Sequence, residues 1–382
     1  MGPPPARDAF TVYDAAAGHL RDHYAGVNMG LLEDWLTEGR AMLSGRCEGH
    51  APCPMALGQE AVETVVNILG DPHTGVGWGM TVAGLRQART ELRVWSGLLT
   101  VMTAGGALQV IHVDPQSPAA RAGFLPGDVV LSVNGQGDKN RLQGRLRQAE
   151  EAGKAFTVER WRAGAAQTVT VTPALWPVGG RPSLRWVEKT AVISVPSFVP
   201  GTGRDFNTLM TIAAAQGASG LIVDLRWNPG GSADECLTAA QGLAGDRVTL
   251  VGIDRSGATR LNWRTSPEAQ AAHARTASPW RGPLALLVSA QTASCGEVLA
   301  YWGQQAGGTV VGLPTRGALS TLANLFDLPG GVLSVTSARA TLDGQRRYPD
   351  RVKPDVTLGN VLGGFRGEDA GLASALDLVR KR

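Results

Sequence analysis

The sequence contains neither an apolar run long enough to cross a bilayer nor a block of basic residues. A transmembrane helix needs ~20 consecutive apolar residues, so we expect no membrane span. The formal net charge of +3 is spread along the chain, which argues against a nucleic-acid-binding surface. The first residues, MGPPPARDAF, also lack the apolar segment of a secretory signal peptide. What remains is a globular composition, and 382 residues are enough for two or three domains.

Cysteine is also scarce, with four in the chain. Cys47 and Cys53 bracket a short loop and can close a small disulfide in an exported protein. The alternative is a metal site with His50, although structural zinc sites use four ligands at tighter spacings. Cys236 and Cys295 have the character of small buried apolar residues, and no motif supports Cys295 as a nucleophile. We therefore expect no metal and no other cofactor.

Residues 1–80 form a predicted N-terminal helical region. Apolar residues recur at spacings of three and four over Tyr13–Tyr24, Leu31–Leu43 and Leu57–Leu69. A turn-rich loop around His73 follows, and on local pattern alone this residue is a solvated loop histidine.

Residues 95–173 have the pattern of a small β-rich domain with one helix, at Asn140–Glu151. The strand-like runs are Leu98–Met102, Leu108–Val113, Asp128–Val133, Ala155–Trp161 and Gln167–Thr172.

Residues 174–382 alternate strands and helices, an order that predicts an α/β core with helices on the sheet. The expected strands are Thr190–Pro196, Gly220–Leu225, Arg247–Ile253 and Pro283–Val288, and the expected helices are Asp205–Gln216 and Ala233–Ala244.

Ser294 lies on a predicted strand-to-helix turn. The buried strand pattern of Leu284–Val288 is followed by small and polar residues and then by a helical pattern from Glu297 onward. Such a turn exposes a hydroxyl and directs the first helical N–H groups at it. An acyl enzyme needs this combination of nucleophile and oxyanion donors. The alternative is that Ser294 is only a helix N-cap, with Glu297 completing a capping box.

Two sequence motifs resemble known families. Residues 117–135, SPAARAGFLPGDVVLSVNG, resemble the SPAxxAGLxxGDxIxxVNG core of PDZ domains. That resemblance implies a carboxylate-binding turn at Gly97, Leu98 and Leu99, where a peptide C-terminus adds as a strand. A β-domain without a ligand is the alternative.

Residues 221–231, LIVDLRWNPGG, resemble the LxxDLRxNPGG signature of the carboxyl-terminal processing, or tail-specific, serine proteases. The resemblance implies an α/β fold with a crotonase-like ββα protease core, an N-terminal helical region and an inserted PDZ domain. It implies polypeptide substrates, recognised by their C-terminal residues, and a periplasmic or other extracytoplasmic location. It leaves the oligomeric state open.

The same resemblance assigns the site residues. Ser294 matches the family's nucleophile and Glu297 the glutamate three residues on. The implied oxyanion donors are the backbone N–H groups of Gly231, of Gly230 and of Cys295.

The family's lysine base is missing here. Ala318 stands at its position in residues 312–322, GLPTRGALSTL, and a methyl group cannot accept a proton. A branch similar to the tricorn core protease uses a histidine from an LGDxHT loop, and residues 69–74, LGDPHT, match that loop. His73 is therefore the expected base. Tyr348 stands where that branch has its orienting acid, so the nearby Asp350 is expected to substitute.

Two hypotheses follow from these residues. In the first, the chain is an active serine endopeptidase with a Ser294–His73 pair. In the second, it is an inactive pseudoprotease that binds peptides through its PDZ domain. The absence of the lysine favours this second hypothesis. A crotonase-type acyl-CoA enzyme shares the core fold but leaves the PDZ domain unexplained.

Overall fold

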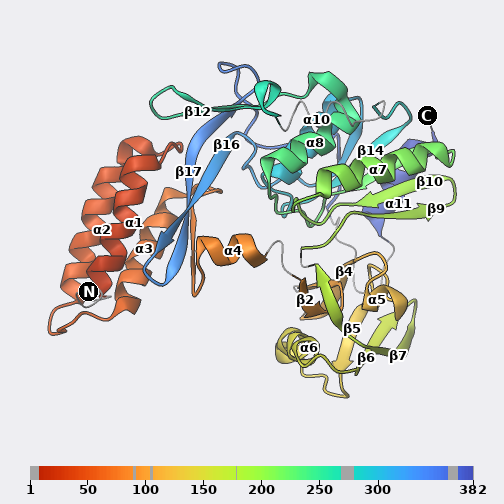
Figure 1. Cartoon of the computed structure of the whole chain (residues 1–382), viewed down its shortest axis with the longest axis horizontal. Coiled ribbons are helices and arrows are strands. Elements are labelled where there is room, and N and C mark those ends of the chain that lie inside the picture. Colours follow the sequence, from red (N-terminus) through yellow and green to blue (C-terminus); the bar gives the residue numbers. More distant parts are fainter. Residues whose placement is uncertain are drawn as a thin grey trace. The chain divides into compact units, whose positions relative to one another are not determined.

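The computed structural model describes residues 8–88, 92–103, 106–177, 179–267, 279–359 and 369–381. The chain divides into two compact units, each built from three separate segments (Figure 1). The first unit comprises Met1–Gln87, Thr249–Ser266 and Gly317–Asp350, and the second comprises Ala88–Val248, Pro267–Arg316 and Arg351–Arg382. Among the described residues, no helix is both long and apolar enough to cross a membrane.

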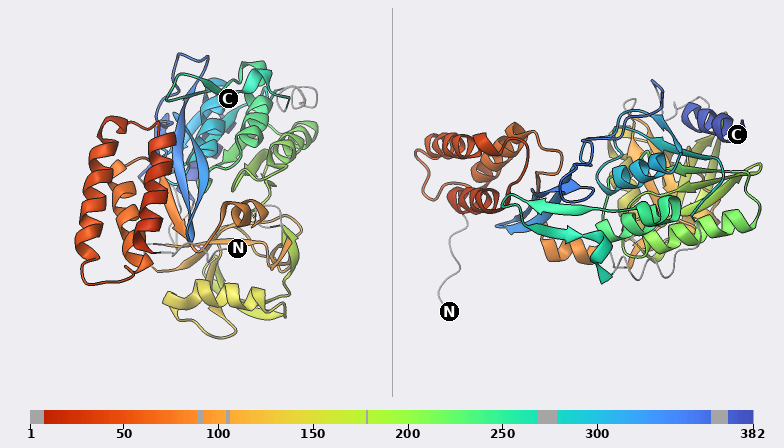
Figure 2. Two further views of the ribbon diagram at one scale, coloured as in Figure 1. Left: turned by 60° about the vertical axis from the view of Figure 1, so that its left-hand side comes forward. Right: turned by 90° about the horizontal axis from the view of Figure 1, so that it is seen from above.

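The first unit packs three helices against an antiparallel sheet. The helices are α1 (Ala9–His23), α2 (Leu32–Arg46) and α3 (Met55–Leu69), with the 3-10 turn η1 (Met29–Leu31), and Figure 2 shows them side by side. The sheet has the order β1 (Gly75–Trp78), β17 (Gly331–Thr341), β12 (Val251–Asp254) and β13 (Thr259–Asn262), and β16 (Thr321–Leu328) also pairs with β17. Helix α4 (Val82–Ala88) and the turn η4 (Trp263–Thr265) complete the elements. The apolar faces of the helices bury Leu328, Leu333 and Val335 of the sheet, which explains the helical spacing in the sequence.

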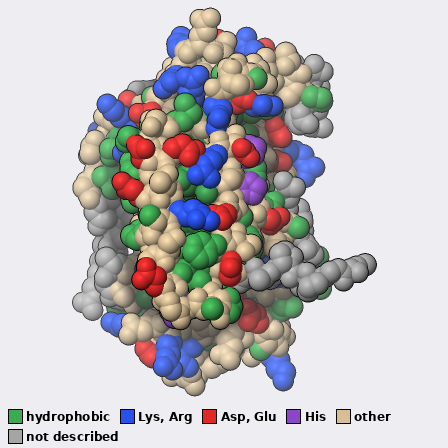
Figure 3. All heavy atoms as spheres, turned by 90° about the vertical axis from the view of Figure 1, so that its left-hand side faces the viewer, with side chains coloured by type: hydrophobic (Ala, Val, Ile, Leu, Met, Phe, Trp, Pro, Cys, Tyr) green, Lys and Arg blue, Asp and Glu red, His purple; other side chains and the backbone are tan. Residues whose placement is uncertain are grey.

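Charges of both signs alternate over the outer face of these helices (Figure 3). Exposed pairs such as Arg21–Glu33 and Arg40–Asp14, both 2.9 Å apart, account for part of this pattern. Exposed ion pairs of this kind contribute little to stability.

A disulfide joins Cys47 and Cys53, which confirms the predicted bridge. Because both sulfur atoms are in this bond, the alternative of a metal site with His50 is wrong.

The PDZ-like part of the second unit is an antiparallel sheet in the order β3-β4-β5-β6-β7, with β3 at an edge. The strands are β3 (Leu98–Met102), β4 (Leu108–Val113), β5 (Val129–Val133), β6 (Phe156–Arg162) and β7 (Ala165–Val171). Helices α5 (Pro118–Arg121) and α6 (Leu142–Glu151), the turn η2 (Lys139–Arg141) and the pair β2 (Leu92–Trp95) and β8 (Ala174–Pro177) accompany them. Each predicted strand is present, within a few residues of its expected bounds.

The remaining part of the second unit is a mostly parallel sheet in the order β18-β15-β14-β11-β10-β9. Its strands are β9 (Ser183–Val187), β10 (Thr190–Ser194), β11 (Gly220–Asp224), β14 (Leu284–Val288), β15 (Thr309–Gly312) and β18 (Val356–Thr357). Its helices are α7 (Thr202–Ala215), α8 (Ala233–Ala244), α10 (Cys295–Gln305) and α11 (Ala370–Arg380), with the turn η3 (Gly245–Arg247). The predicted α/β core is therefore confirmed.

Helices cover both faces of this sheet. Helix α11 packs on the face that carries Ile222 and Leu287. Successive residues of a strand point to opposite faces, so Leu286, which lies against Gly303 of α10, is on the other face. Strands buried on both faces are continuously apolar, as β14 is.

One predicted strand pairs with a different sheet from the one expected. The run Arg247–Ile253 was expected in the α/β core, but the strand there, β12, pairs antiparallel with β17 in the first unit.

Candidate active site

Ser294 occupies a strained turn between β14 and α10. Its φ is +51° and its ψ is −119°. Residues other than glycine rarely adopt a positive φ of this kind. An ordinary N-cap serine has extended backbone angles, so this residue is not a simple cap. Backbone strain of this kind concentrates at functional sites. The turn leaves Ser294 half-buried at the positive end of helix α10.

The glycine turn lies directly beside the serine. Strand β11 pairs in parallel with β14, so the turns after both strands meet at one edge of the sheet. A Cβ added to Gly230 would lie 2.8 Å from the Cβ of Ser294. A Cβ added to Gly231 would lie 2.1 Å from the carbonyl oxygen of Phe198. Only glycine allows these approaches.

Asn228 ties three chain segments together beneath this site. It is fully buried. Its amide donates to the carbonyl of Val195, and its own carbonyl accepts the backbone N–H of Ala293, over 2.8 and 2.9 Å. Its side-chain oxygen accepts the N–H of Gly230 over 2.8 Å. The asparagine thus fixes the glycine turn against the serine turn.

Two of the three backbone N–H groups expected as oxyanion donors are available for that role. Within the described part of the chain, the N–H groups of Gly231 and Cys295 make no hydrogen bond. The N–H of Gly230 is already taken by Asn228, which argues against the donor role expected for it. Free donors at a helix N-terminus beside a hydroxyl are what a tetrahedral intermediate requires.

Glu297 holds the serine turn and is fully buried. Its carboxylate accepts the backbone N–H of Ser294 over 2.8 Å and the hydroxyl of Thr315 over 2.5 Å. The capping box proposed from the sequence is therefore present. Its carboxylate orients the backbone of Ser294, so Glu297 positions this serine rather than acting on a substrate.

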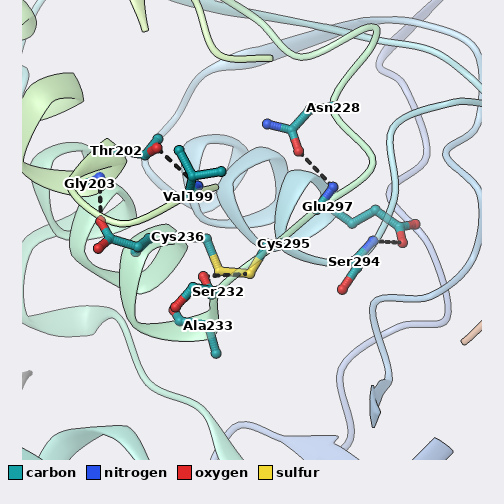
Figure 4. The surroundings of a disulfide bond; sticks show 12 residues. Val199, Thr202, Gly203, Asn228, Ser232, Ala233, Cys236, Ser294, Cys295 and Glu297 are labelled. Atoms are coloured by element: carbon teal, nitrogen blue, oxygen red, sulfur yellow. Dashed lines mark hydrogen bonds between the residues drawn. A yellow bond between two sulfur atoms is a disulfide. The ribbon is translucent and has the colours of Figure 1, made fainter. Parts of the chain in front are cut away.

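Cys295 is joined to Cys236 of α8 by a disulfide (Figure 4). The interpretation of both cysteines as buried apolar residues was therefore wrong, although both are buried. The sequence showed no spacing signal, because the two residues are 59 positions apart and meet only through the packing of α8 on α10.

The loop around His73 belongs to the first unit. Asp71 organises it by accepting the backbone N–H groups of His73 and Thr74, over 2.9 and 3.2 Å. Thr336 of β17 also donates its hydroxyl to this carboxylate over 2.6 Å. These bonds explain the Asp of the LGDPHT motif, and its Thr is explained by the Thr74 hydroxyl, which accepts the N–H of Thr336 over 3.1 Å.

The His73 ring has a partner that the sequence did not indicate. Its Nδ1 lies 2.7 Å from the hydroxyl oxygen of Thr321, the first residue of β16. Asp350, the expected orienting acid, instead accepts the hydroxyl of Ser320 over 2.9 Å. Tyr348 is buried and donates its hydroxyl to the carbonyl of Thr249. Ala318 is also buried.

The expected carboxylate-binding turn precedes edge strand β3. Gly97 has a φ of +84°, and its carbonyl accepts the N–H of Asp114 over 2.9 Å. The N–H of Leu98 lies 3.3 Å from the hydroxyl of Ser96. Beneath the turn, Glu150 of α6 accepts the Ser96 hydroxyl and N–H. Burial raises the pKa of Glu150 to about 7, although these hydrogen bonds oppose the shift.

Comparison with known proteins agrees with this architecture. Residues 189–358 match the model of peptidase family S41, and residues 109–160 match a PDZ domain model. A carboxyl-terminal-processing protease from a Picosynechococcus species is 27% identical over 84% of this chain and 78% of its own. A chloroplastic C-terminal processing peptidase from Tetradesmus obliquus is 27% identical over 78% of this chain and 67% of its own.

Solved structures show the same fold. The photosystem II D1 C-terminal processing protease has a TM-score of 0.52 at 22% identity, covering 95% of this chain and 98% of its own. An S41 protease from Bacteroides fragilis has a TM-score of 0.61 at 15% identity, covering 100% of this chain and 99% of its own.

A peptidase core and a PDZ domain on one chain make this protein a PDZ-containing serine peptidase. Within that class, residues 189–358 form a peptidase family S41 domain, and the comparisons support a serine protease of the carboxyl-terminal processing type. The comparisons do not support the alternative of an inactive pseudoprotease.

Proposed function

We propose that this peptidase uses Ser294 as its nucleophile and His73 as its general base. The observation that carries the nucleophile is the left-handed backbone of Ser294 beside two free N–H groups. The proposal for His73 rests on its motif and on its ordered ring, and it requires the histidine to reach Ser294 in the active enzyme.

In this mechanism the Oγ of Ser294 attacks the carbonyl carbon of the scissile peptide bond. The proton of the hydroxyl passes to Nε2 of His73, which later gives it to the departing amine. The N–H groups of Gly231 and Cys295 stabilise the oxyanion. Water then hydrolyses the acyl ester on Ser294.

Thr321 would orient the base. If Nδ1 of His73 carries the proton and donates it to the Thr321 hydroxyl 2.7 Å away, Nε2 is left as the acceptor. This role replaces the one expected for Asp350, whose carboxylate is bonded to Ser320.

The test compares Ser294→Ala, His73→Ala and Thr321→Val in hydrolysis of an unfolded protein such as casein. Ser294→Ala should lose activity by several orders of magnitude, and His73→Ala by about 10²–10⁴-fold. Thr321→Val should lose less, with an altered pH profile. Ser219→Ala is the matched control, since Ser219 is exposed at the opposite end of β11. Full hydrolysis by Ser294→Ala contradicts the nucleophile, and full hydrolysis by His73→Ala contradicts the base.

We also propose that the PDZ domain selects polypeptides by their C-terminal residues. The support is the Gly97 turn and the edge position of β3, which can pair with a peptide strand. Isothermal titration of the full chain with an apolar-tailed peptide should give binding that is lost when the peptide carboxylate is amidated. Equal affinity for the acid and the amide would contradict tail recognition.

The two disulfides favour an oxidising compartment. We propose an extracytoplasmic location on this ground. In functional terms, residues 1–80 are proposed as the helical part, residues 95–173 as the peptide-selecting part, and residues 174–382, with part of the N-terminal region, as the catalytic part.

A further inference from the structure

The Cys236–Cys295 disulfide joins the two backbone segments that carry the proposed oxyanion donors. Cys295 follows the nucleophile and supplies one donor through its own N–H. Cys236 lies in the first turn of α8, whose N-cap, Ser232, directly follows the other donor, Gly231. Figure 4 shows the bond between the N-terminal turns of α8 and α10. The cross-link is therefore placed where the two halves of the oxyanion hole meet.

The segment around Gly231 is held by hydrogen bonds before and beside the glycines, and by the packing of α8 on α10 after them. Phe198 holds it from the opposite side, donating to the carbonyl of Gly230 and accepting the N–H of Ser232, both over 2.9 Å. Asn228 links it to the serine turn before the glycines. On the C-terminal side of Gly231, the Cys236–Cys295 disulfide links the segment covalently to α10. Gly231 itself has a φ of +145°, and glycine rotates more freely than any other residue.

Catalysis depends strongly on the spacing of these donors. An oxyanion donor acts at about 2.7–3.1 Å from the developing charge, and a misplacement of about 1 Å can cost ~10²-fold in rate. A covalent bond between the two segments limits such a displacement. A hydrogen bond between them would limit it less.

We propose that the Cys236–Cys295 disulfide is a positioning element of the oxyanion hole, so that full peptidase activity requires its oxidised form. The inference rests on the proposed function, since it assumes Ser294 as nucleophile. Two-electron reduction by an added dithiol breaks the S–S bond, yields two thiols and converts the dithiol to its own disulfide. The sulfur atoms of Cys295 and Cys236 lie 3.1 and 3.3 Å from the carbonyl oxygens of Ser232 and Ala233. After reduction, the Cys295 thiol could still donate weakly to the Ser232 carbonyl, whereas the Cys236 thiol would donate only within α8.

The first test is kinetic. The oxidised full chain is assayed before and after reduction with dithiothreitol. The variants Cys236→Ser and Cys236→Ser/Cys295→Ser are assayed in the same way. Both variants keep the backbone N–H donor of residue 295. The expected result is a fall in kcat of about 10-fold or more, up to the 10²–10³-fold of a lost donor, with KM changed by less than about threefold. The matched control is Cys47→Ser/Cys53→Ser, which removes the other disulfide and should keep kcat. Circular dichroism confirms that each variant is folded.

The second test does not need activity. Hydrogen exchange followed by mass spectrometry should show faster exchange in peptides covering residues 229–236 and 292–299 of folded Cys236→Ser than of oxidised wild type. The positioning role would be overturned if hydrolysis depends on Ser294 but Cys236→Ser changes neither kcat nor the exchange rate. An equal loss of kcat in the Cys47→Ser/Cys53→Ser control would also overturn it. Hydrolysis that survives Ser294→Ala instead contradicts the proposed function, and the exchange result still decides the role of the disulfide.

Discussion

Glu150 is a buried carboxyl beneath the proposed peptide-binding turn, and its protonation is coupled to folding. Its pKa rises from 4.5 to about 7 because burial disfavours the charged form. Between these values the folded state keeps a proton that the unfolded state has lost. The stability contributed by the neutral group is therefore complete below about pH 4.5 and is lost as the pH rises through about 7.

We expect Glu150→Gln to remove this pH dependence. The amide oxygen can still accept from Ser96, and no charge needs to be buried. Thermal unfolding of the full chain between pH 5 and pH 8 should show the variant gaining stability over wild type as the pH rises. Glu151→Gln is the matched control, since the Glu151 side chain is 66% exposed. Parallel curves for wild type and Glu150→Gln would contradict the linkage.

At the scale of single residues, the sequence predicts those site residues that lie in a motif or in a turn with a characteristic composition. Ser294 and Gly231 stand out because glycines and small residues follow apolar strands, and the structure places both turns together. Thr321 and Cys236 could not be predicted. Their partners, His73 and Cys295, are 248 and 59 residues away, and neither residue type is unusual where it stands.

At the scale of elements, Arg226 connects the end of β11 to the start of α11. Its guanidinium binds Asp224 over 2.6 Å and Asp369 over 2.7 Å, and Asp369 also caps α11 by accepting the N–H of Leu372. Burial opposes ionisation of Asp224, but the attraction of Arg226 outweighs it and keeps the pKa of this carboxyl below its usual range.

We expect Arg226→Ala to destabilise the second unit by about 3–5 kcal/mol, because it leaves a buried carboxylate without its cation. Denaturant unfolding measures this loss. Arg204→Ala, which removes an exposed partner of Asp205, should change stability by no more than about 1 kcal/mol. Similar effects of the two substitutions would show that the network does not hold α11 on the sheet.

Element types were easier to predict from the sequence than element partners. Helices α1–α3 and strands such as β14 show their burial in periodic or continuous apolar residues. Strand β12 follows α8 as the next strand of a parallel core would. It pairs instead with β17, about eighty residues later, and four residues of strand carry no signal that distinguishes these partners.

At the scale of the whole molecule, the first unit depends on segments that are far apart in sequence. Its helices share one apolar core with Leu328, Leu333 and Val335, and Thr336 bonds to Asp71 across 265 positions. No local pattern in residues 1–80 shows that this region is incomplete alone.

We therefore expect a fragment of residues 8–88 not to fold. Without β16 and β17, the apolar faces of α1 and α3 lack part of their cover, and a small helical fragment has little other core. Circular dichroism and NMR should show weak helicity and poor chemical-shift dispersion. The control is the full chain under the same conditions. A cooperative thermal transition in the fragment would contradict this dependence.

The interleaving of segments also sets an order of events during synthesis. The loop that presents His73 is held by Thr321, Ser334 and Thr336, which leave the ribosome more than 240 residues after the histidine. The serine turn at 294 can be completed earlier, since its partners in the glycine turn precede it. Under the proposed mechanism, a nascent chain therefore carries the nucleophile before the strands that order its base have been made. Until those strands are made, an unfinished copy lacks the ordered catalytic pair that the proposed mechanism requires.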